Sequence, residues 1–262
     1  MQSLPTRPSM LPERLIGEGR FWVTTREAAE LLGREPRTAY PRLAELEHSG
    51  KLFSPAKGLY VVVPPEYRSW RVVPADWFID PMMNHLSRSY YVGFLSAAAR
   101  HGAAHQAPQV FQVVVDRSLP DRQLGRVRLH FVKGAHVDDA DCEFVNSHTS
   151  RYRISTREAT AVDLAWRPRE AGGTSNVATV LLEIGDLDGE RMARLASTRG
   201  RGTGRRLGWL LERFRPDVDT FWLEQVARPG EGSAALLVPG NQVRGPLDST
   251  WGLRLNGSVE PD

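Results

Sequence analysis

Apolar side chains recur at helical spacing in two short segments near the N-terminus. Four of them fall on one stripe of the first segment: Ala28, Ala29, Leu31 and Leu32. Thr24 stands three residues before Glu27, which is the spacing of a capping box, and Gly33 supplies the left-handed residue that commonly ends a helix. The pattern predicts a helix that begins at Thr24 and ends at Gly33.

The second segment has the pattern of another amphipathic helix, and Pro36 fits its first turn because the missing N–H costs nothing there. Three apolar residues recur at i, i+4 and i+7 and are expected to face a core: Ala39, Leu43 and Leu46. The opposite face is basic and polar in its first half and carries Glu45 and Glu47 in its second half. Pro41 inside the segment indicates either a kink or a late helix start.

Residues 51–63 hold two β-favouring runs joined by a turn sequence with Pro55 and Gly58. Proline sets a turn and glycine allows positive φ, so a hairpin with Lys57 at its tip is expected. Helix, tight turn, helix and basic-tipped hairpin together describe a winged helix-turn-helix. The alternative is a small three-helix subdomain with a solvated charged face.

The N-terminal half of the second helix is the candidate DNA-reading surface, because the helix dipole there also favours phosphate. Arg37 is the candidate base contact, since a guanidinium can pair bidentately with guanine. Thr38 and Tyr40 share this outward half. The candidate phosphate contacts are Arg34, Arg42 and Lys57. For each arginine the alternative is a solvated surface residue.

The rest of the chain mixes strand and helix patterns without regular alternation, which favours an α+β fold. We expect a winged helix-turn-helix domain at residues 1–75 and a larger mixed α+β domain at 76–262. Strand patterns occupy residues 110–116, 126–134 and 152–155. A helix is expected within residues 90–109, and Ser155 with Glu158 has the spacing of another capping box.

The composition is that of an ordinary globular protein, with 41% hydrophobic and 25% charged residues in 262. Cys142 is the one cysteine, so no disulfide can form within the chain, and the apolar runs are too short to span a bilayer. We therefore expect a cytoplasmic protein that does not enter a membrane. The net charge is +3, and residues 1–75 hold 11 Lys and Arg against 8 Asp and Glu. The whole positive excess lies in this N-terminal part.

Few residues suggest catalysis or a cofactor. His101 and His105 are four apart, as helical zinc pairs are, but no glutamate follows His101. Residues 197–208, STRGRGTGRRLG, lack the phosphate-loop pattern and predict a flexible basic loop. That loop is a candidate second basic patch for nucleic acid or an acidic partner, formed by Arg199, Arg201, Arg205 and Arg206. We expect no metal, no cofactor and no enzymatic activity.

Several stretches together resemble the AbiEi-type antitoxins, the transcriptional-regulator half of type IV abortive-infection toxin–antitoxin systems. They include GKLFSPAKGLYVV, YYVGFLSAAARHGAAHQAPQVFQVVVD, RVRLHFVK, RISTREATAVDLAWRP, GGTSNVATVLLEI, RRLGWLLE and GPLDSTWGLRLN. The resemblance covers most of the chain after about residue 20 and rests on the order of these pieces.

The resemblance implies an N-terminal domain that binds operator DNA and represses its own operon. It also implies a C-terminal domain that counteracts a cognate nucleotidyltransferase-like toxin, without catalysis by this chain. A two-fold operator would suit a weak dimer or two monomers side by side. Two alternatives stay open: a one-component regulator whose C-terminal domain senses a small molecule, and an enzyme of nucleic-acid metabolism that uses the winged helix for targeting.

Overall fold

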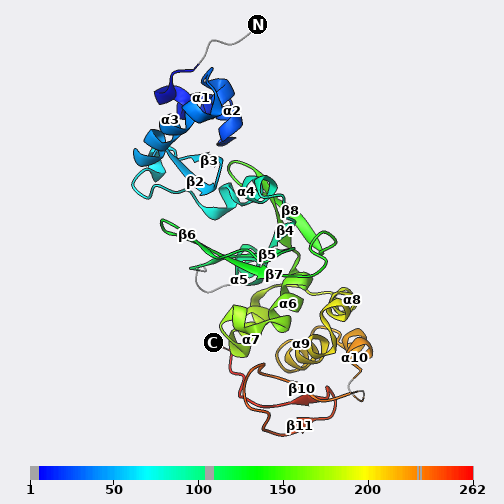
Figure 1. Ribbon diagram of the computed structural model, residues 1–262. Helices are drawn as coiled ribbons and strands as arrows, with labels where there is room; N and C mark the ends of the chain where they lie inside the picture. Colours follow the sequence, from blue (N-terminus) through cyan, green and yellow to red (C-terminus); the bar gives the residue numbers. More distant parts are fainter. Residues whose placement is uncertain (1–5, 104–108, 229, 231, 262) are drawn as a thin grey trace. The chain divides into compact units, whose positions relative to one another are not determined.

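The computed structural model describes residues 6–103, 109–228, 230 and 232–261, and its mixed α+β class confirms the class expected from the sequence (Figure 1). The chain divides into two compact units. The first comprises residues 1–90, 109–138 and 144–153, and the second comprises residues 91–108, 139–143 and 154–262. Each unit is described by itself, and the domain boundary expected at residue 75 stays a prediction.

The N-terminal part of the first unit contains three helices and a small sheet around one hydrophobic core. Its elements are η1 (Pro8–Met10), α1 (Leu11–Gly17), β1 (Trp22–Thr24), α2 (Thr25–Leu31), α3 (Pro36–His48), β2 (Leu52–Ala56) and β3 (Leu59–Val62). The sheet has the order β1-β3-β2, and both pairings are antiparallel. Helices and sheet together bury Leu11, Leu15, Ala28, Leu43, Leu52 and Val62, so the helices pack on the sheet as one cluster.

Both helices expected in this region form. α2 has Thr24 as its N-cap with the capping box to Glu27 complete, and Gly33 follows it with a φ of +61°. α3 begins at Pro36 and runs through Pro41, so the late start is wrong. The three apolar positions predicted to face the core, Ala39, Leu43 and Leu46, are buried.

The expected hairpin also forms, with a tighter turn than the sequence predicts. β2 and β3 pair up to Ala56 and Leu59, which leaves Lys57 and Gly58 as the turn, and Gly58 has a φ of +85°. Pro55 lies inside β2 and not in the turn. The register of the pair shifts between Phe53 and Ala56, and such an irregularity tolerates a residue that cannot donate to the ladder.

The remaining elements of the first unit lead into a six-stranded sheet. They are η2 (Pro65–Tyr67), η3 (Ala75–Trp77), α4 (Ile79–His85), β5 (Phe111–Val115), β6 (Arg122–Leu124) and β7 (Val127–Lys133). The sheet also includes β4 (Tyr90–Val92), β8 (Cys142–Asn146) and β9 (Arg151–Ser155), in the order β6-β7-β5-β4-β9-β8. β5 runs parallel to β7, and β6 runs antiparallel to it. The three predicted strands are confirmed.

The start of the helix expected within residues 90–109 is a strand instead. β4 takes Tyr90–Val92, and α5 (Phe94–Arg100) begins only after Gly93. Tyrosine and valine favour a pleated, half-buried surface, and this preference decides the first three residues.

The second unit is largely helical. After α5 it contains α6 (Arg157–Trp166), η4 (Pro168–Ala171), α7 (Thr174–Glu183), α8 (Gly189–Arg199), α9 (Arg201–Phe214), α10 (Phe221–Ala227), β10 (Ala235–Leu236), β11 (Leu247–Asp248) and β12 (Leu253–Arg254). The short strands form a sheet in the order β10-β12-β11. α6 buries seven of its ten residues and packs on α5, α7, α8 and α9, so it is the central helix.

The N-cap of α6 is Thr156 and not Ser155. The Oγ1 of Thr156 accepts a hydrogen bond from the backbone N–H of Ala159 at 3.3 Å. The hydroxyl of Ser155 lies 2.7 Å from that of Thr160 and donates to the carbonyl of Val92. The predicted Ser155 cap is therefore wrong, because that hydroxyl is used inside the core.

Residues 197–208 are helical, so the prediction of a flexible loop is wrong. α8 runs to Arg199 and α9 starts at Arg201, with Gly200 at a φ of +92° as the single break. A Cβ added at Gly208 would overlap the indole ring of Trp251, and one at Gly204 would reach the Cβ of Ala227 at 3.5 Å. Gly208 therefore serves the close packing of a helix, which sequence composition does not distinguish from flexibility, whereas a Cβ at Gly204 would make an ordinary van der Waals contact.

Candidate nucleic-acid interface

The start of α2 is fixed by its capping box. The backbone N–H of Thr24 donates to the Oε2 of Glu27 at 2.8 Å, and the N–H of Glu27 donates back to the threonine Oγ1. Arg20 pairs with the other carboxylate oxygen at 2.9 Å. Burial alone would raise the pKa of Glu27, but the bonds from Thr24 and the charge of Arg20 outweigh it and lower that pKa. The cap is therefore ionised at neutral pH.

The break between α2 and α3 is short. Gly33 takes the left-handed conformation, and the N–H of Arg34 donates to the carbonyl of Ala29 at 3.0 Å. α3 then starts with no side-chain cap on Glu35, although the Thr38 hydroxyl donates to the carbonyl of Glu35 at 2.9 Å. The first turn of α3 consequently presents polar groups outward after a break of only four residues, 32–35.

The sequence-predicted side chains of α3 and its preceding turn lie on the outer side of the helix. All five are exposed: Arg34, Arg37, Thr38, Tyr40 and Arg42. Tyr40 keeps 44% of its surface accessible although it is a large aromatic residue. Arg42 forms two hydrogen bonds with the carboxylate of Glu45, at 2.8 and 2.9 Å. Its charge is thus partly neutralised, which leaves Arg37 as the stronger candidate for a direct contact.

The hairpin that carries Lys57 is held in place by two side chains from elsewhere in the same unit. Arg122 donates to the carbonyl of Pro55 at 2.6 Å, and His85 Nε2 lies 2.9 Å from the carbonyl of Lys57. The N–H of Thr25 donates to the carbonyl of Gly58 at 2.9 Å. The Lys57 side chain is exposed, so the hairpin offers a charge on a fixed backbone.

Sequence reasoning misses both supports. His85 lies 28 residues and Arg122 lies 67 residues from the carbonyl that it contacts. Nothing in the local pattern around either residue indicates such a contact. The same unit also joins the N-terminal core to later residues through rings, since Phe21 packs edge-on against both Trp77 and His148.

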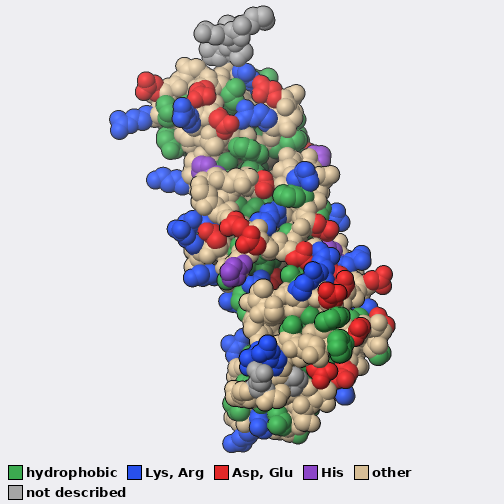
Figure 2. Space-filling model, turned by 90° about the vertical axis from the view of Figure 1, so that its right-hand side faces the viewer, with side chains coloured by type: hydrophobic (Ala, Val, Ile, Leu, Met, Phe, Trp, Pro, Cys, Tyr) green, Lys and Arg blue, Asp and Glu red, His purple; other side chains and the backbone are tan. Residues whose placement is uncertain are grey.

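Charge alone does not mark an interface. On the face drawn in Figure 2, basic and acidic side chains are intermingled over the surface. The net charge of +3 agrees with such a mixed surface. The local arrangement on α3 and the hairpin is therefore more informative than the overall potential.

The four arginines predicted as a second basic patch do not lie together at the surface. Arg201 is exposed, but Arg205 and Arg206 are only 2% and 6% exposed. Arg205 donates to the carbonyls of Ala227, Arg228 and Ser233. The prediction of a surface patch is wrong for Arg205 and Arg206, because their guanidinium groups satisfy backbone carbonyls inside the fold.

Arg206 satisfies backbone carbonyls inside the fold in the same way. It donates to the carbonyls of Leu236, Leu237 and Ala165. No carboxylate pairs with it in these bonds, and burial lowers its pKa to about 10. The group is still charged at neutral pH, and the carbonyl dipoles stabilise that charge.

Arg199 is part of a buried ion pair. Its Nη2 donates to Asp163 and to the Tyr91 hydroxyl, both at 2.8 Å, and its guanidinium lies over the ring of Trp166 at 4.4 Å. Burial raises the pKa of Asp163, while Asp163 raises the pKa of Arg199 against the opposing effect of burial. A buried pair of this kind is a structural element of the second unit and not an open binding surface.

The candidate histidine pair does not form a described site. His101 Nε2 lies 2.8 Å from the carbonyl of Ser155, and His105 lies outside the described residues. Within the described parts of the chain, no group of three or more His, Cys, Asp or Glu side chains is arranged to hold a metal ion. No helix in those parts is both long and apolar enough to cross a membrane.

Two comparisons with known proteins give matches. Residues 91–213 match the family model described as the AbiEi antitoxin C-terminal domain, which supports the family expected from the sequence. A crystal structure of the RV2827C protein from Mycobacterium tuberculosis is similar, with a TM-score of 0.70 and 18% identity over 97% of this chain and 92% of that one. At this identity the likeness shows the fold alone. A comparison with curated proteins finds no significant match.

Proposed function

We propose, starting from the match of residues 91–213 to the AbiEi antitoxin C-terminal domain, that the chain is the antitoxin of a toxin–antitoxin pair and represses its own operon. In this proposal α2, α3 and the β2–β3 hairpin act as a winged helix-turn-helix on double-stranded operator DNA. The C-terminal region counteracts a nucleotidyltransferase-like toxin. The matched domain supports the antitoxin role, and the geometry of the N-terminal region supports DNA binding.

The observation that carries the DNA-binding proposal is the exposed surface of the N-terminal half of α3. Arg37, Thr38 and Tyr40 are exposed there, and the first turn of the helix contains no acidic residue. The positive end of a helix dipole adds to the charge of Arg37. A duplex would therefore meet the N-terminal half of α3, while Glu45 and Glu47 in the second half would repel its phosphates.

Lys57 is proposed as a phosphate contact beside this helix. The contacts of Arg122 and His85 fix the backbone of the hairpin, so little backbone entropy is lost when its lysine side chain meets a phosphate. A phosphate contact contributes affinity that does not depend on sequence and that weakens as salt is added.

Binding of the full-length protein to the DNA upstream of its own gene tests this interface. Arg37→Ala should lose about 1–3 kcal/mol of binding free energy, and Lys57→Ala should lower the salt dependence by about one phosphate contact. Arg117→Ala is the matched control, because Arg117 is exposed on a loop of the same unit and was not assigned to the interface. Wild-type affinity in both Arg37→Ala and Lys57→Ala would remove the proposed interface.

The antitoxin half has its own test. Expression of the gene next to this one should stop bacterial growth, and co-expression of this chain should restore it. A full-length Arg37→Ala, Lys57→Ala double variant should lose repression and keep the rescue of growth, because the family match lies at residues 91–213. Failure of the wild-type chain to rescue growth would contradict the antitoxin role without affecting DNA binding.

The second candidate function is a one-component regulator whose C-terminal region senses a small molecule. The observation that favours it is a groove of about 630 Å³ in the second unit. A regulator of this kind would release operator DNA when the molecule binds, whereas the antitoxin would not need such a ligand.

A further inference from the structure

The six-stranded sheet has two edge strands, and they differ (Figure 1). β6 at one edge has three residues, and its Arg122 donates to the carbonyl of Pro55. β8 at the other edge has five residues, CEFVN, and contains neither lysine nor proline. Short strands, edge lysines and edge prolines protect a sheet edge against pairing with another chain. Among the described residues no strand pairs with the outer side of β8, so this edge is open.

The backbone of β8 alternates between its neighbour β9 and the open edge. The two strands are joined by residues 147–150 and therefore run antiparallel. The N–H of Ser147 donates to the carbonyl of Ser150, and the N–H of Thr156 donates to the carbonyl of Asp141. Bonded positions alternate along an antiparallel ladder, so the odd-numbered residues of β8 bond to β9. The even-numbered residues direct their N–H and C=O groups to the open edge.

Phe144 is one of these even-numbered residues and lies at the centre of the open edge. It is the middle residue of β8, and 59% of its surface is exposed. The guanidinium group of Arg151 on β9 lies 5.0 Å from the centre of its ring, and this contact orients the ring. A large apolar side chain that stays exposed on an unprotected edge strand is typical of a surface that binds another chain.

We propose that β8 pairs with β8 of a second copy of this chain, antiparallel and about a two-fold axis at Phe144. Full overlap of two antiparallel copies of β8 places the middle residue opposite itself. Phe144 directs its backbone groups outward, so the two copies can exchange backbone hydrogen bonds at the axis. Each sheet then continues into the sheet of the other copy.

The side chains of β8 suit a second copy of the same strand. Glu143 is the single charged residue of β8, and in this register it stands opposite Val145 and not opposite a like charge. The two Phe144 side chains stand directly opposite each other on one face, and cross-strand aromatic pairs of this kind stabilise a sheet. Asn146 stands opposite Cys142. No pair in the overlap therefore brings two like charges together.

A two-fold pairing requires one strand to be complementary to itself, and β8 meets this condition over its whole length. The overlap of five residues is small beside a standard interface of about 20–30 residues a side, so the dimer is weak and depends on concentration. This pairing is independent of the proposed DNA contacts and of the antitoxin role. Its test needs neither DNA nor a toxin.

Sedimentation equilibrium of the full-length protein tests the pairing. Between about 1 and 300 µM the protein should shift from monomer to dimer, with a Kd below about 100 µM. A monomer throughout this range overturns the proposal. Assemblies larger than a dimer also overturn it, because a two-fold edge pairing closes at two copies.

An exchange of charges at Phe144 tests the register. Phe144→Lys and Phe144→Glu each place two like charges opposite each other, so each variant alone should dimerise at least about tenfold more weakly than the wild type. An equimolar mixture places lysine opposite glutamate and should dimerise at least about tenfold more tightly than either variant alone. A mixture that stays as monomeric as its two components overturns the two-fold pairing.

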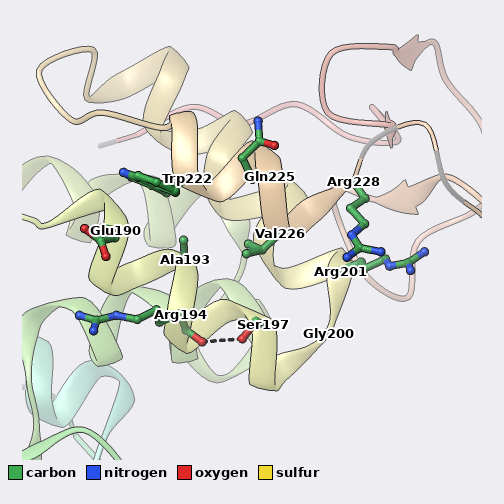
Figure 3. A pocket seen from close by; sticks show the side chains of 10 residues that line it. All are labelled: Glu190, Ala193, Arg194, Ser197, Gly200, Arg201, Trp222, Gln225, Val226 and Arg228. Carbon is green, nitrogen blue, oxygen red and sulfur yellow. Dashed lines mark hydrogen bonds between the residues drawn. The ribbon is translucent and has the colours of Figure 1, made fainter.

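Trp222 provides the matched control. It is also a large aromatic residue, 46% exposed, but it belongs to α10 and lines a groove between α8 and α10 (Figure 3). Trp222→Lys should dimerise as the wild type does, and a loss equal to that of Phe144→Lys overturns the proposal. Thermal unfolding checks the fold of each variant. If a charge variant is unstable, Asn146→Pro carries the test, because it removes an outward N–H and no bond to β9. Wild-type dimerisation of Asn146→Pro overturns the pairing.

Discussion

Arg37 of α3 and Arg206 of α9 both belong to arginine-rich helix starts in the sequence, and they differ completely in the structure. Arg37 is exposed at the start of an amphipathic helix, whereas Arg206 is 6% exposed and donates to carbonyls of three residues. The first is a surface charge that a partner can use, and the second holds chain segments together. A cluster of arginines therefore indicates an interface only when the burial of each residue is known.

The largest expected effect on the second unit comes from breaking its buried ion pair. Asp163→Ala would leave the guanidinium of Arg199 buried without its carboxylate, so the free energy of unfolding should fall by about 3–5 kcal/mol. Urea unfolding followed by circular dichroism measures it. An unchanged unfolding midpoint would mean that the pair contributes no stability.

Arg206→Met should destabilise the protein by about 2–3 kcal/mol, because carbonyls of Leu236, Leu237 and Ala165 would lose their charged donor. The same urea experiment measures this loss. DNA affinity of the folded variant should stay at the wild-type value, and a selective loss of DNA binding would restore Arg206 as a contact residue.

A smaller effect concerns acid stability. A hydrogen bond from Arg191 is the main cause that lowers the pKa of Asp141 below its ordinary value of 3.8. A lowered carboxyl pKa stabilises the folded state above the ordinary value, and this contribution is lost as the pH falls through the lowered one. Partial exposure screens the pair, so Asp141→Asn should cost about 1 kcal/mol at pH 7.

A comparison of wild type and Asp141→Asn at neutral and acidic pH serves as the control for this prediction. As the pH falls through the lowered pKa, the wild-type carboxyl takes up a proton, so the difference in unfolding free energy between wild type and Asp141→Asn should be smaller at acidic pH than at pH 7. Urea unfolding at both pH values measures the difference. A difference that grows toward low pH would contradict the assignment of the pair to Asp141 and Arg191.

The smallest effect on stability belongs to Arg37. Arg37→Ala removes an exposed side chain with no described partner in the fold, and surface changes of this kind stay within about 0.5 kcal/mol. Thermal unfolding should give the wild-type midpoint within that margin. A large destabilisation would show that Arg37 supports the fold as Arg206 does, and the contrast between the two helices would disappear.

The sequence predicts those parts of the fold that depend on neighbours along the chain. The capping box of Thr24, the break at Gly33 and the hairpin at Lys57 each follow from a few adjacent residues. The glycines of α9 mislead because their partners are distant. The sequence around Gly208 has the composition of a loop. The structure shows that Trp251, 43 positions later, packs against this glycine.

The candidate interface also has features that follow from neighbouring residues and features that depend on residues far along the chain. Exposure of Arg37, Thr38 and Tyr40 follows from the helical period once Ala39 and Leu43 face the core. The contacts that fix the hairpin come from residues far along the chain and have no local signature. The burial of Arg205 and Arg206 also depends on remote backbone carbonyls, so sequence patterns could not predict it.

The most direct test of the central claim is the sequence specificity of Arg37→Ala. Affinity is measured at one fixed salt concentration for the upstream operator and for a scrambled duplex of the same length. If Arg37 reads a base, the ratio of the two affinities should fall by about tenfold or more, while affinity for the scrambled duplex changes little. An unchanged ratio would contradict the claim that the first half of α3 reads operator DNA.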